Sequence, residues 1–284
     1  MPADIQAFFD PATFTVTYLV SDPATKHAVI IDPVLDFNFN RARTSTTSAD
    51  KVLEAAKGMT IGWILETHAH ADHLTASHYL QEKTGAKIAI GEGIRGTQDF
   101  FGAMFNAKDV KGDGAPFDRL LKDGDKIPLG KLEIEVLHTP GHTAGCVSYK
   151  IDGNIFIGDT MFMPDYGTAR TDFPGGDART LYRSIKRLLS YPPETVLWLC
   201  HDYLPNGRTE YKWKTTVAEQ RAKNILVRDG ISEDEFVETR KARDKPLAPP
   251  MLILPSIQVN IRAGRMPPAD DNGKVYLKFP VNRI

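Results

Sequence analysis

Histidine and aspartate side chains are concentrated in one short stretch of this sequence. The segment THAHADH, residues 67–73, contains His68, His70, Asp72 and His73. Imidazole and carboxylate groups are common ligands of zinc and of non-haem iron. The stretch therefore predicts a metal site, although its residue types alone leave open which metal binds and which of the four side chains hold it.

Further side chains of the same kind follow other apolar runs later in the chain. His142 lies in HTPGHTAG, Asp159 in FIGDT and His201 in LCHDY. Loops at the ends of strands are where a rigid sheet presents its reactive groups. A single histidine at such a place is more often structural than a ligand. Here, however, four different strands are each followed by histidine or aspartate residues, which predicts one shared metal centre.

Alternating strands and helices are expected to position these groups. Strands are predicted for the apolar runs at 27–33, 60–68, 87–91, 131–138 and 195–200, and a hairpin is predicted to turn near Asp152 and Gly153. Helices are predicted over 48–58, with Ser48 as N-cap and Gly58 after the last turn, over 72–85 and over 177–190. This mixture indicates an α/β layer architecture.

The chain becomes more polar beyond residue 204. Ser232 and Glu235 predict a capping box for a helix that runs to about Ala242. The proline-rich stretch KPLAPPMLILPSIQV that follows predicts extended chain. We therefore predict a catalytic domain over 1–204 and, over 205–284, a C-terminal appendage of helical and extended chain packed on that domain.

Composition and charge exclude several classes of protein. The 284 residues are 42% hydrophobic and 25% charged, and their formal net charge of −1 argues against an electrostatic nucleic-acid binder. No run of apolar residues is long enough to predict a membrane span, and no signal peptide is predicted at the N-terminus. Cys146 and Cys200 are too few for a disulfide framework and are expected to be buried, so we predict a cytoplasmic protein.

The motifs THAHADH, HTPGHTAG, GDT and HDY, in this order, resemble those of the metallo-β-lactamase superfamily. The likeness runs from about residue 10 to residue 204. It implies a four-layer αββα sandwich with the metal site at one edge, between the two sheets. The superfamily contains zinc hydrolases, flavo-di-iron proteins and nucleases, so the fold by itself does not determine the function.

Other segments narrow the resemblance to the persulfide dioxygenases. These segments are 43–50, 161–185 and 254–268. The resemblance implies an Fe(II) enzyme that oxidises glutathione persulfide with O₂ and water to sulfite and glutathione. Members of this family are often homodimers, so a homodimer is an expectation. Thr171 departs from the family pattern, where many relatives have cysteine in ARCDF, and this departure argues against thiol chemistry at that position but leaves the metal site unaffected.

The resemblance also implies roles for the ligand-type residues. It assigns one Fe(2+) per chain to His68, His142 and Asp159, which form the two-histidine, one-carboxylate set of non-haem iron oxygenases. The remaining four residues then support these ligands through hydrogen bonds or form a vacant second metal site. They are His70, Asp72, His73 and His201.

The same seven residues are compatible with a different enzyme. Zinc enzymes of the glyoxalase II type use them to bind two Zn(2+), with Asp159 as the bridge. A dinuclear zinc hydrolase of a thioester or a lactone is therefore the alternative, and metal analysis distinguishes the two. A non-catalytic metal-binding protein ranks last, because all seven positions are intact.

Arg170 and Tyr203 are the predicted catalytic and substrate-binding residues. A guanidinium group can bind a carboxylate of glutathione through two parallel hydrogen bonds. The alternative for Arg170 is a structural ion pair with Asp165 or Asp172. Tyr203 follows the HD pair of the HDY motif, where the resemblance places a tyrosine close to the metal, and its alternative is a packed core aromatic.

Overall fold

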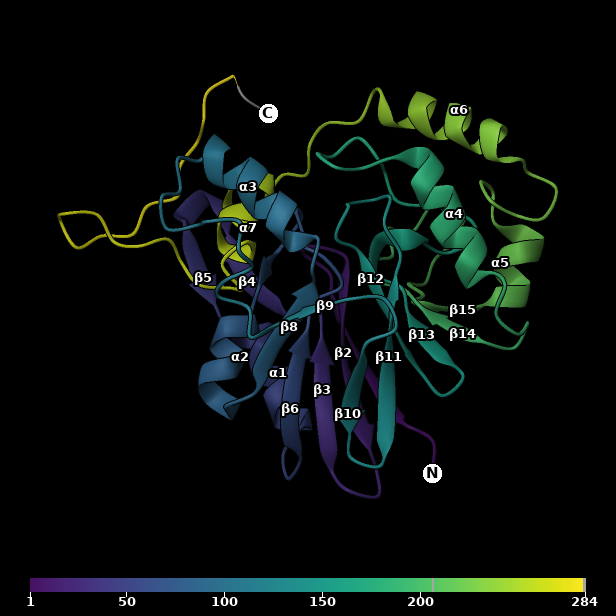
Figure 1. The fold of residues 1–284 in the computed structure, drawn as a ribbon, viewed down its shortest axis with the longest axis horizontal. Helices are drawn as coiled ribbons and strands as arrows, with labels where there is room; N and C mark the ends of the chain where they lie inside the picture. The colour runs from purple at the N-terminus through teal and green to yellow at the C-terminus, as the bar shows by residue number, and fades with distance from the viewer. Residues whose placement is uncertain (206, 283–284) are drawn as a thin grey trace.

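The computed structural model describes residues 1–205 and 207–282, and in this part of the chain two six-stranded sheets pack face to face (Figure 1). The first sheet contains, in spatial order, β1 (Asp4–Asp10), β2 (Thr15–Asp22), β3 (His27–Ile31), β6 (Thr60–Leu65), β8 (Lys87–Gly91) and β9 (Arg119–Leu121). Its strands β3, β6, β8 and β9 are parallel, so their carboxyl ends lie along the same edge. The loops that follow β3 and β6 therefore meet there.

The second sheet is antiparallel except for one pair of strands. It contains, in spatial order, β10 (Lys126–Leu129), β11 (Leu132–His138), β12 (Val147–Ile151), β13 (Asn154–Phe156), β14 (Val196–Trp198) and β15 (Lys214–Thr216). β13 and β14 are the parallel pair. The predicted hairpin is confirmed between β12 and β13, and Asp152 takes a positive φ of 49° in its turn.

Helices cover the outer face of each sheet. The first sheet packs, through residues such as Ile30 and Ile64, against α1 (Thr47–Ala55), α2 (Ser77–Thr84), the start of α3 (Ile94–Met104) and α7 (Ile253–Asn260). The second sheet packs against α4 (Ala178–Leu188), α5 (Val217–Lys223) and α6 (Glu233–Asp244). A third apolar cluster, with Tyr18 and Tyr149 among its largest members, fills the space between the sheets. The four-layer αββα sandwich implied by the family resemblance is confirmed.

Two of the predicted helix starts are wrong. The helix expected over 72–85 begins at Ser77, because Leu74–Thr75 form β7, which pairs with β4 (Val34–Asn38) in a small sheet completed by β5 (Arg43–Ser45). Ser48 is not the N-cap of α1, since that position is Thr46. Ser48 lies in the first turn, where its backbone N–H and its hydroxyl both donate to Asp36. A carboxylate from β4 thus performs the capping that we assigned to the serine.

The proline-rich stretch after residue 244 contains a helix, so the prediction of extended chain is wrong there. Pro255 is the third residue of α7. In the first turn of a helix the missing N–H of proline has no intrahelical acceptor to lose, so the helix tolerates it. The predicted N-cap is confirmed, because the Ser232 side chain accepts a hydrogen bond from the Glu235 backbone, and α6 continues to Asp244.

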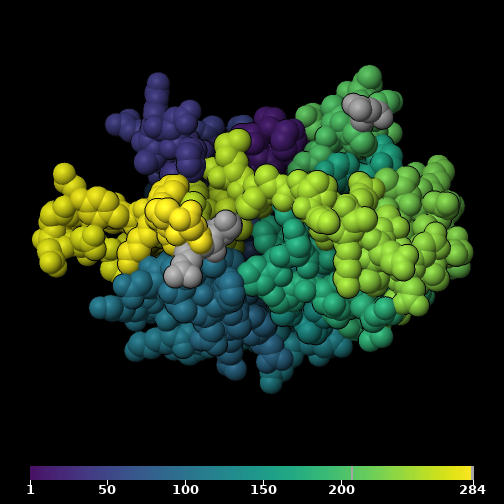
Figure 2. Space-filling view, turned by 90° about the horizontal axis from the view of Figure 1, so that it is seen from above, coloured from purple at the N-terminus to yellow at the C-terminus, as the bar shows by residue number. Residues whose placement is uncertain are grey.

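The chain beyond residue 204 contacts both halves of the sandwich. β15 extends the second sheet, α5 and α6 pack on that sheet, and α7 packs on the first. The segment between α6 and α7 crosses the top of the molecule (Figure 2). The division of the chain at residue 204 stays a prediction. Within the described residues, no helix combines the length and the apolar character needed to cross a lipid bilayer.

Candidate metal centre

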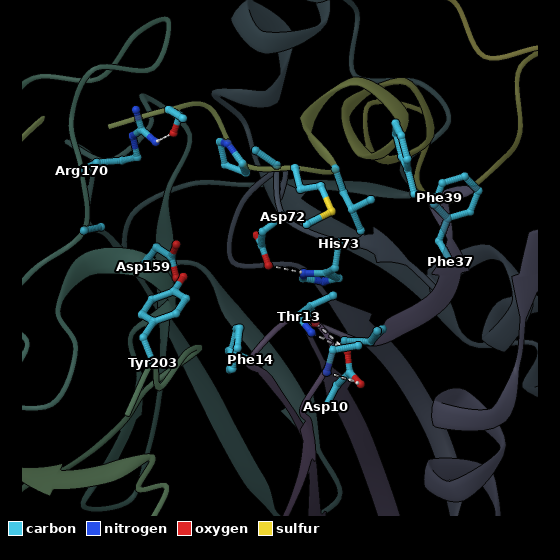
Figure 3. A pocket seen from close by; sticks show the side chains of 18 of the residues that line it. Asp10, Thr13, Phe14, Phe37, Phe39, Asp72, His73, Asp159, Arg170 and Tyr203 are labelled. Atoms are coloured by element: carbon cyan, nitrogen blue, oxygen red, sulfur yellow. Dashed lines mark hydrogen bonds and ion pairs between the residues drawn. The ribbon is translucent and has the colours of Figure 1, made fainter. Parts of the chain in front are cut away.

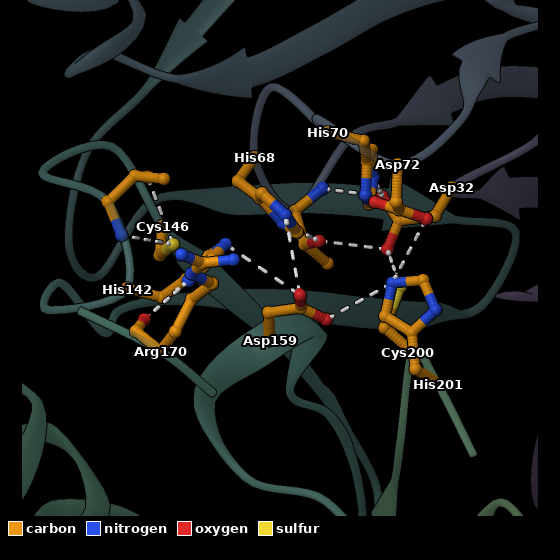
Figure 4. Close-up of polar contacts among 12 residues, drawn as sticks. Asp32, His68, His70, Asp72, His142, Cys146, Asp159, Arg170, Cys200 and His201 are labelled. Atoms are coloured by element: carbon orange, nitrogen blue, oxygen red, sulfur yellow. Dashed lines mark hydrogen bonds and ion pairs between the residues drawn. The ribbon is translucent and has the colours of Figure 1, made fainter. Parts of the chain in front are cut away.

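All seven predicted ligand residues meet at the edge of the sandwich where strands of both sheets end. Figure 4 labels all of them except His73. His68, His70, Asp72 and His73 follow β6, and His201 follows β14. His142 lies in the loop between β11 and β12, and Asp159 lies just after β13. The turn before Asp159 requires glycine, because Gly158 has a φ of +49° and a Cβ there would lie 2.7 Å from the Cβ of Thr67.

His68, His142 and Asp159 direct their donor atoms at one another. The Nε2 atoms of His68 and His142 lie 4.0 Å and 3.7 Å from Oδ2 of Asp159. On the far side of the ring, His142 Nδ1 donates to the carbonyl of Arg170 at 2.8 Å. A carbonyl only accepts hydrogen bonds, so Nδ1 carries the proton and the lone pair of Nε2 faces the centre.

The ring of His68 is oriented by a hydroxyl. Thr67 Oγ1 donates to the buried carboxylate of Asp32 at 2.8 Å, and it lies 3.0 Å from His68 Nδ1. With its own proton used, the Thr67 oxygen accepts from Nδ1–H, and Nε2 faces Asp159. Burial, followed by the neighbouring imidazoles, lowers the pKa of His68 well below its usual range, so this ring is neutral, which is the form that binds metals.

A second group of donors faces the other oxygen of Asp159. His201 Nε2 lies 3.4 Å from Oδ1 of Asp159 and 3.5 Å from Oδ2 of Asp72. The Nε2 atoms of His73 and His201 and Oδ1 of Asp159 are buried, and none has a hydrogen-bond partner among the described residues. Buried polar atoms are normally satisfied, so this donor set fits a metal ion. Asp159 thus lies between two groups of possible ligands.

His70 is held by two carboxylates. Its Nε2 lies 3.0 Å from Asp32 and 3.6 Å from Glu66. Burial alone would lower the pKa of His70, but Asp32 and Glu66 raise it well above its usual range. Glu66 also accepts hydrogen bonds from the hydroxyls of Thr75 and Ser77. The charges of Asp32 and Glu66 therefore hold the Nε2 side of the His70 ring, and neither ring nitrogen has a hydrogen-bond partner among the described residues.

Besides Thr67 and Asp32, the sequence interpretation missed Thr15, Glu66 and Asn260, which also support the centre. Thr15 Oγ1 lies 3.2 Å from Asp72 and 3.3 Å from His73 Nδ1, and Glu66 pairs with His70. Asn260, on α7, donates from Nδ2 to the carbonyls of His70 and His73 at 2.8 Å each, while its Oδ1 accepts from the Thr75 backbone at 2.8 Å. No local pattern marks Asn260, which is 190 residues away from His70 in the chain.

Replacement of Asn260 by alanine is expected to loosen the loop of residues 70–75. Each buried backbone group left without a partner costs about 1–3 kcal/mol, so the unfolding free energy should fall by roughly 3 kcal/mol or more. Metal affinity should fall about 10–100-fold, because the loop carries candidate ligands. Urea unfolding and metal competition measure the two effects. Asn272→Ala is the control, because Asn272 is an exposed asparagine in the chain after α7. Equal effects of both variants would contradict the role of Asn260.

A cavity of about 1040 Å³ opens onto the centre (Figure 3). Among its lining residues are Asp72, His73, His142 and Asp159, and four aromatic residues, Phe14, Phe162, Tyr166 and Tyr203. The ring of Tyr203 stacks on His201 with centroids 5.5 Å apart. Burial, followed by the carboxylates of Asp159 and Asp72, raises the pKa of the Tyr203 phenol well above its usual range. Tyr203 therefore lies beside His201, one of the candidate ligands, as a protonated hydrogen-bond donor.

Arg170 lines the same cavity, but its guanidinium group is engaged within the protein. Its Nε and Nη2 donate to the two oxygens of Asp172 at 2.6 Å and 2.7 Å. Its Nη1 donates to the carbonyl of Ala248 at 2.7 Å. The structural ion pair with Asp172 is thus present, whereas Asp165 pairs with Arg208 instead. The role of Arg170 as a substrate anchor stays a prediction.

Comparison with known families matches residues 10–201 to the metallo-beta-lactamase superfamily. The chain belongs to the metallo-β-lactamase superfamily. The four layers of the fold and the histidine and aspartate donors at its edge agree with this membership. The protein is accordingly a metal-dependent enzyme of the metallo-β-lactamase superfamily.

Relatives within this superfamily cover almost the whole chain. A Burkholderia pseudomallei protein named "Probable metallo-hydrolase" is 50% identical over 99% of this chain and 99% of its own length. "Glyoxylase B2" of Dictyostelium discoideum is 46% identical over 99% and 98%, respectively. "Persulfide dioxygenase ETHE1, mitochondrial" of Bos taurus is 32% identical over 94% and 91%. The solved structure of ETHE1 from Myxococcus xanthus is also similar, with a TM-score of 0.73 and 32% identity over 92% of this chain and 100% of that chain.

Proposed function

We propose that this protein is a non-haem Fe(II) dioxygenase that oxidises glutathione persulfide with O₂ and water to sulfite and glutathione. The observation that carries the proposal is the group of His68, His142 and Asp159. Two imidazole nitrogens and one carboxylate oxygen face one another, the two imidazoles are oriented by contacts at Nδ1, and His142 and Asp159 line a large cavity. This donor set is typical of Fe(II) oxygenases, because it leaves coordination positions for a substrate and O₂.

The reaction is balanced by its own reactants. One persulfide, one O₂ and one water give one thiol and one sulfite with two protons. The two sulfur atoms together lose four electrons, and O₂ gains four. No further reductant is required, and the similarity to proteins named persulfide dioxygenase supports this assignment.

The charge of the cavity supports an anionic substrate. Arg41, Arg43 and Arg243 line it, and their guanidinium groups form no ion pair or side-chain hydrogen bond within the described part of the chain. Glutathione carries two carboxylates, which such groups can bind. Aromatic side chains on the metal side of the cavity leave a less polar environment for the reacting sulfur.

Iron bound at this site would supply adjacent positions for the persulfide sulfur and O₂ and would exchange electrons with them. The residues of the chain orient and protect this chemistry. The Arg170 carbonyl and the Thr67 hydroxyl hold the two histidines with Nε2 facing inwards. Tyr203, kept protonated, can donate a hydrogen bond beside Asp159.

A dinuclear zinc hydrolase is the second candidate, and a specific observation favours it. The buried, unpartnered Nε2 atom of His201 lies beside Asp72 and Asp159, and His70, Asp72 and His73 offer further donor atoms close to one another, so a second donor set is present. Relatives named metallo-hydrolase and glyoxylase share more identity with this chain than the persulfide dioxygenases do. A zinc-bound water would then be the nucleophile for a thioester.

Metal content and O₂ consumption distinguish the two candidates. Protein purified without oxygen should contain about one iron per chain and should consume O₂ and form sulfite when glutathione persulfide is added. Two zinc ions per chain, with hydrolysis of a glutathione thioester and no O₂ uptake by the iron-loaded protein, would replace this proposal with the second candidate.

Arg170→Ala tests the predicted substrate anchor. Loss of a charge-assisted hydrogen bond costs roughly 1.5–3 kcal/mol, so kcat/KM for glutathione persulfide should fall about 10–100-fold with iron content unchanged. A persulfide without carboxylates should lose much less, and Arg170→Lys should recover only part of the loss. Asp172→Ala is the matched control. If Asp172→Ala reproduces every effect of Arg170→Ala, then Arg170 serves the ion pair and does not bind the substrate.

A further inference from the structure

One peptide group connects the candidate ligand His142 to helix α6. Its carbonyl, on Arg170, accepts the hydrogen bond from His142 Nδ1 at 2.8 Å (Figure 4). Its N–H, on Thr171, donates to Oδ2 of Asp244 at 2.9 Å. The two ends of the same peptide group are therefore bonded to an imidazole and to a carboxylate.

Asp244 is held rigidly where it meets this peptide. It is 4% exposed, and its Oδ2 also accepts from the Thr171 hydroxyl at 3.0 Å. Its Oδ1 accepts from Nε and Nη2 of Arg240 at 2.9 Å and 2.6 Å. Arg240 is equally buried and donates from Nη1 to the carbonyl of Thr168 at 3.0 Å. A buried network in which each member has partners fixes a single arrangement.

We propose that Asp244 is a positioning residue of the metal centre, acting on His142 through the Thr171–Arg170 peptide. Hydrogen bonds in a chain polarise one another. A carboxylate that accepts from the peptide N–H makes the carbonyl at the other end a stronger acceptor. The stronger acceptor pulls on the Nδ1 proton of His142 and raises the electron density at Nε2. Histidine ligands that donate to a carboxylate directly gain basicity in the same way.

The other histidine of the triad has the same arrangement. Thr67 Oγ1 lies between His68 Nδ1 and the buried carboxylate of Asp32, at 3.0 Å and 2.8 Å. Each of the two imidazoles thus reaches a buried carboxylate through one intervening group, a hydroxyl for His68 and a peptide for His142. The carboxylate for His142 comes from the chain beyond residue 204. The inference rests on metal binding at His142 and not on the dioxygenase reaction.

The test uses the full chain loaded with Zn(2+), which is diamagnetic, and follows the Nδ1–H proton resonance of His142 by NMR. Asp244→Asn combined with Arg240→Gln removes both charges of the buried pair, so neither is left alone. We expect the His142 resonance to move upfield and the Zn(2+) affinity in chelator competition to fall about 10–100-fold. Asp109→Asn combined with Arg262→Gln, at another ion pair with a buried arginine, is the control and should change neither quantity.

Thr171→Val supplies a second test with the opposite sign. It removes the competing hydroxyl donor from Asp244 and leaves the backbone N–H, so the carboxylate should accept more strongly from the peptide. The His142 resonance should then move downfield. An unchanged resonance in a folded Asp244→Asn/Arg240→Gln protein would overturn the proposal. If that protein does not fold, an unchanged or upfield resonance in Thr171→Val would do so.

Discussion

Asp159→Ala is expected to abolish iron binding, and His68→Ala and His142→Ala are expected to do the same. These three side chains direct their donor atoms at one another, so removal of one leaves two ligands. The loss of affinity should exceed the 10–100-fold that is typical of residues that only orient a ligand. Iron content after dialysis measures the effect.

His73→Ala is the matched comparison for these variants. Its Nδ1 lies 3.1 Å from Asp72, its Nε2 is unpartnered among the described residues, and it groups with His70 and Asp72 as a possible metal ligand. If a single iron is bound by His68, His142 and Asp159, His73→Ala should retain most of the iron. Equal iron loss in all four variants would show that both donor groups hold metal, and it would favour the dinuclear candidate.

Asp32→Ala is expected to have the largest effect on stability. Asp32 is 2% exposed and accepts from the Thr67 backbone at 2.7 Å and from the Thr67 hydroxyl, while His70 lies 3.0 Å away. Burial raises the pKa of Asp32, but His70 and Thr67 lower it by more, so the net pKa lies below its usual value and the carboxylate is charged. Removal of one member of a buried ion pair typically costs about 3–5 kcal/mol, because the other charge is left without a partner.

Urea unfolding of the metal-free protein measures this effect without a contribution from ligand binding. Asp229→Ala is the control, since Asp229 pairs with Arg221 at the surface, where both side chains are about half exposed. Exposed pairs of this kind contribute at most about 1 kcal/mol. A loss in Asp32→Ala no larger than that of Asp229→Ala would mean that the cluster around His70 does not stabilise the fold.

Local sequence patterns were enough to predict an α/β layer architecture and to select the seven ligand-type residues, whereas the four-layer αββα arrangement came from the family resemblance. Each of these patterns involves only a few consecutive residues. Examples are the alternation in KLEIEVLH, the apolar runs before His68 and His201, and the serine that caps α6. Strand and helix periodicity depend on that short range. The same periodicity shows where each strand ends. Because parallel strands end along a common edge, it also indicates that the ligand-type residues after them lie close together.

Only the tertiary structure decided how these side chains are used. Two of the contacts join residues that are far apart in the chain: Asn260 bonds the loop of residues 70–75, and Asp244 is linked to His142. A third depends on side-chain orientation, since the Arg170 guanidinium group bonds Asp172 and the carbonyl of Ala248. A hydrogen bond is set by distance and angle between atoms, which residue order alone does not specify. The helix at Pro255 likewise forms because its apolar residues are buried against the first sheet and the α3 region, and the proline stands in the first turn, where a helix tolerates it. The sequence thus determined which ligand types the site contains, and the packing of the chain determined which atom of each histidine of the candidate triad faces Asp159.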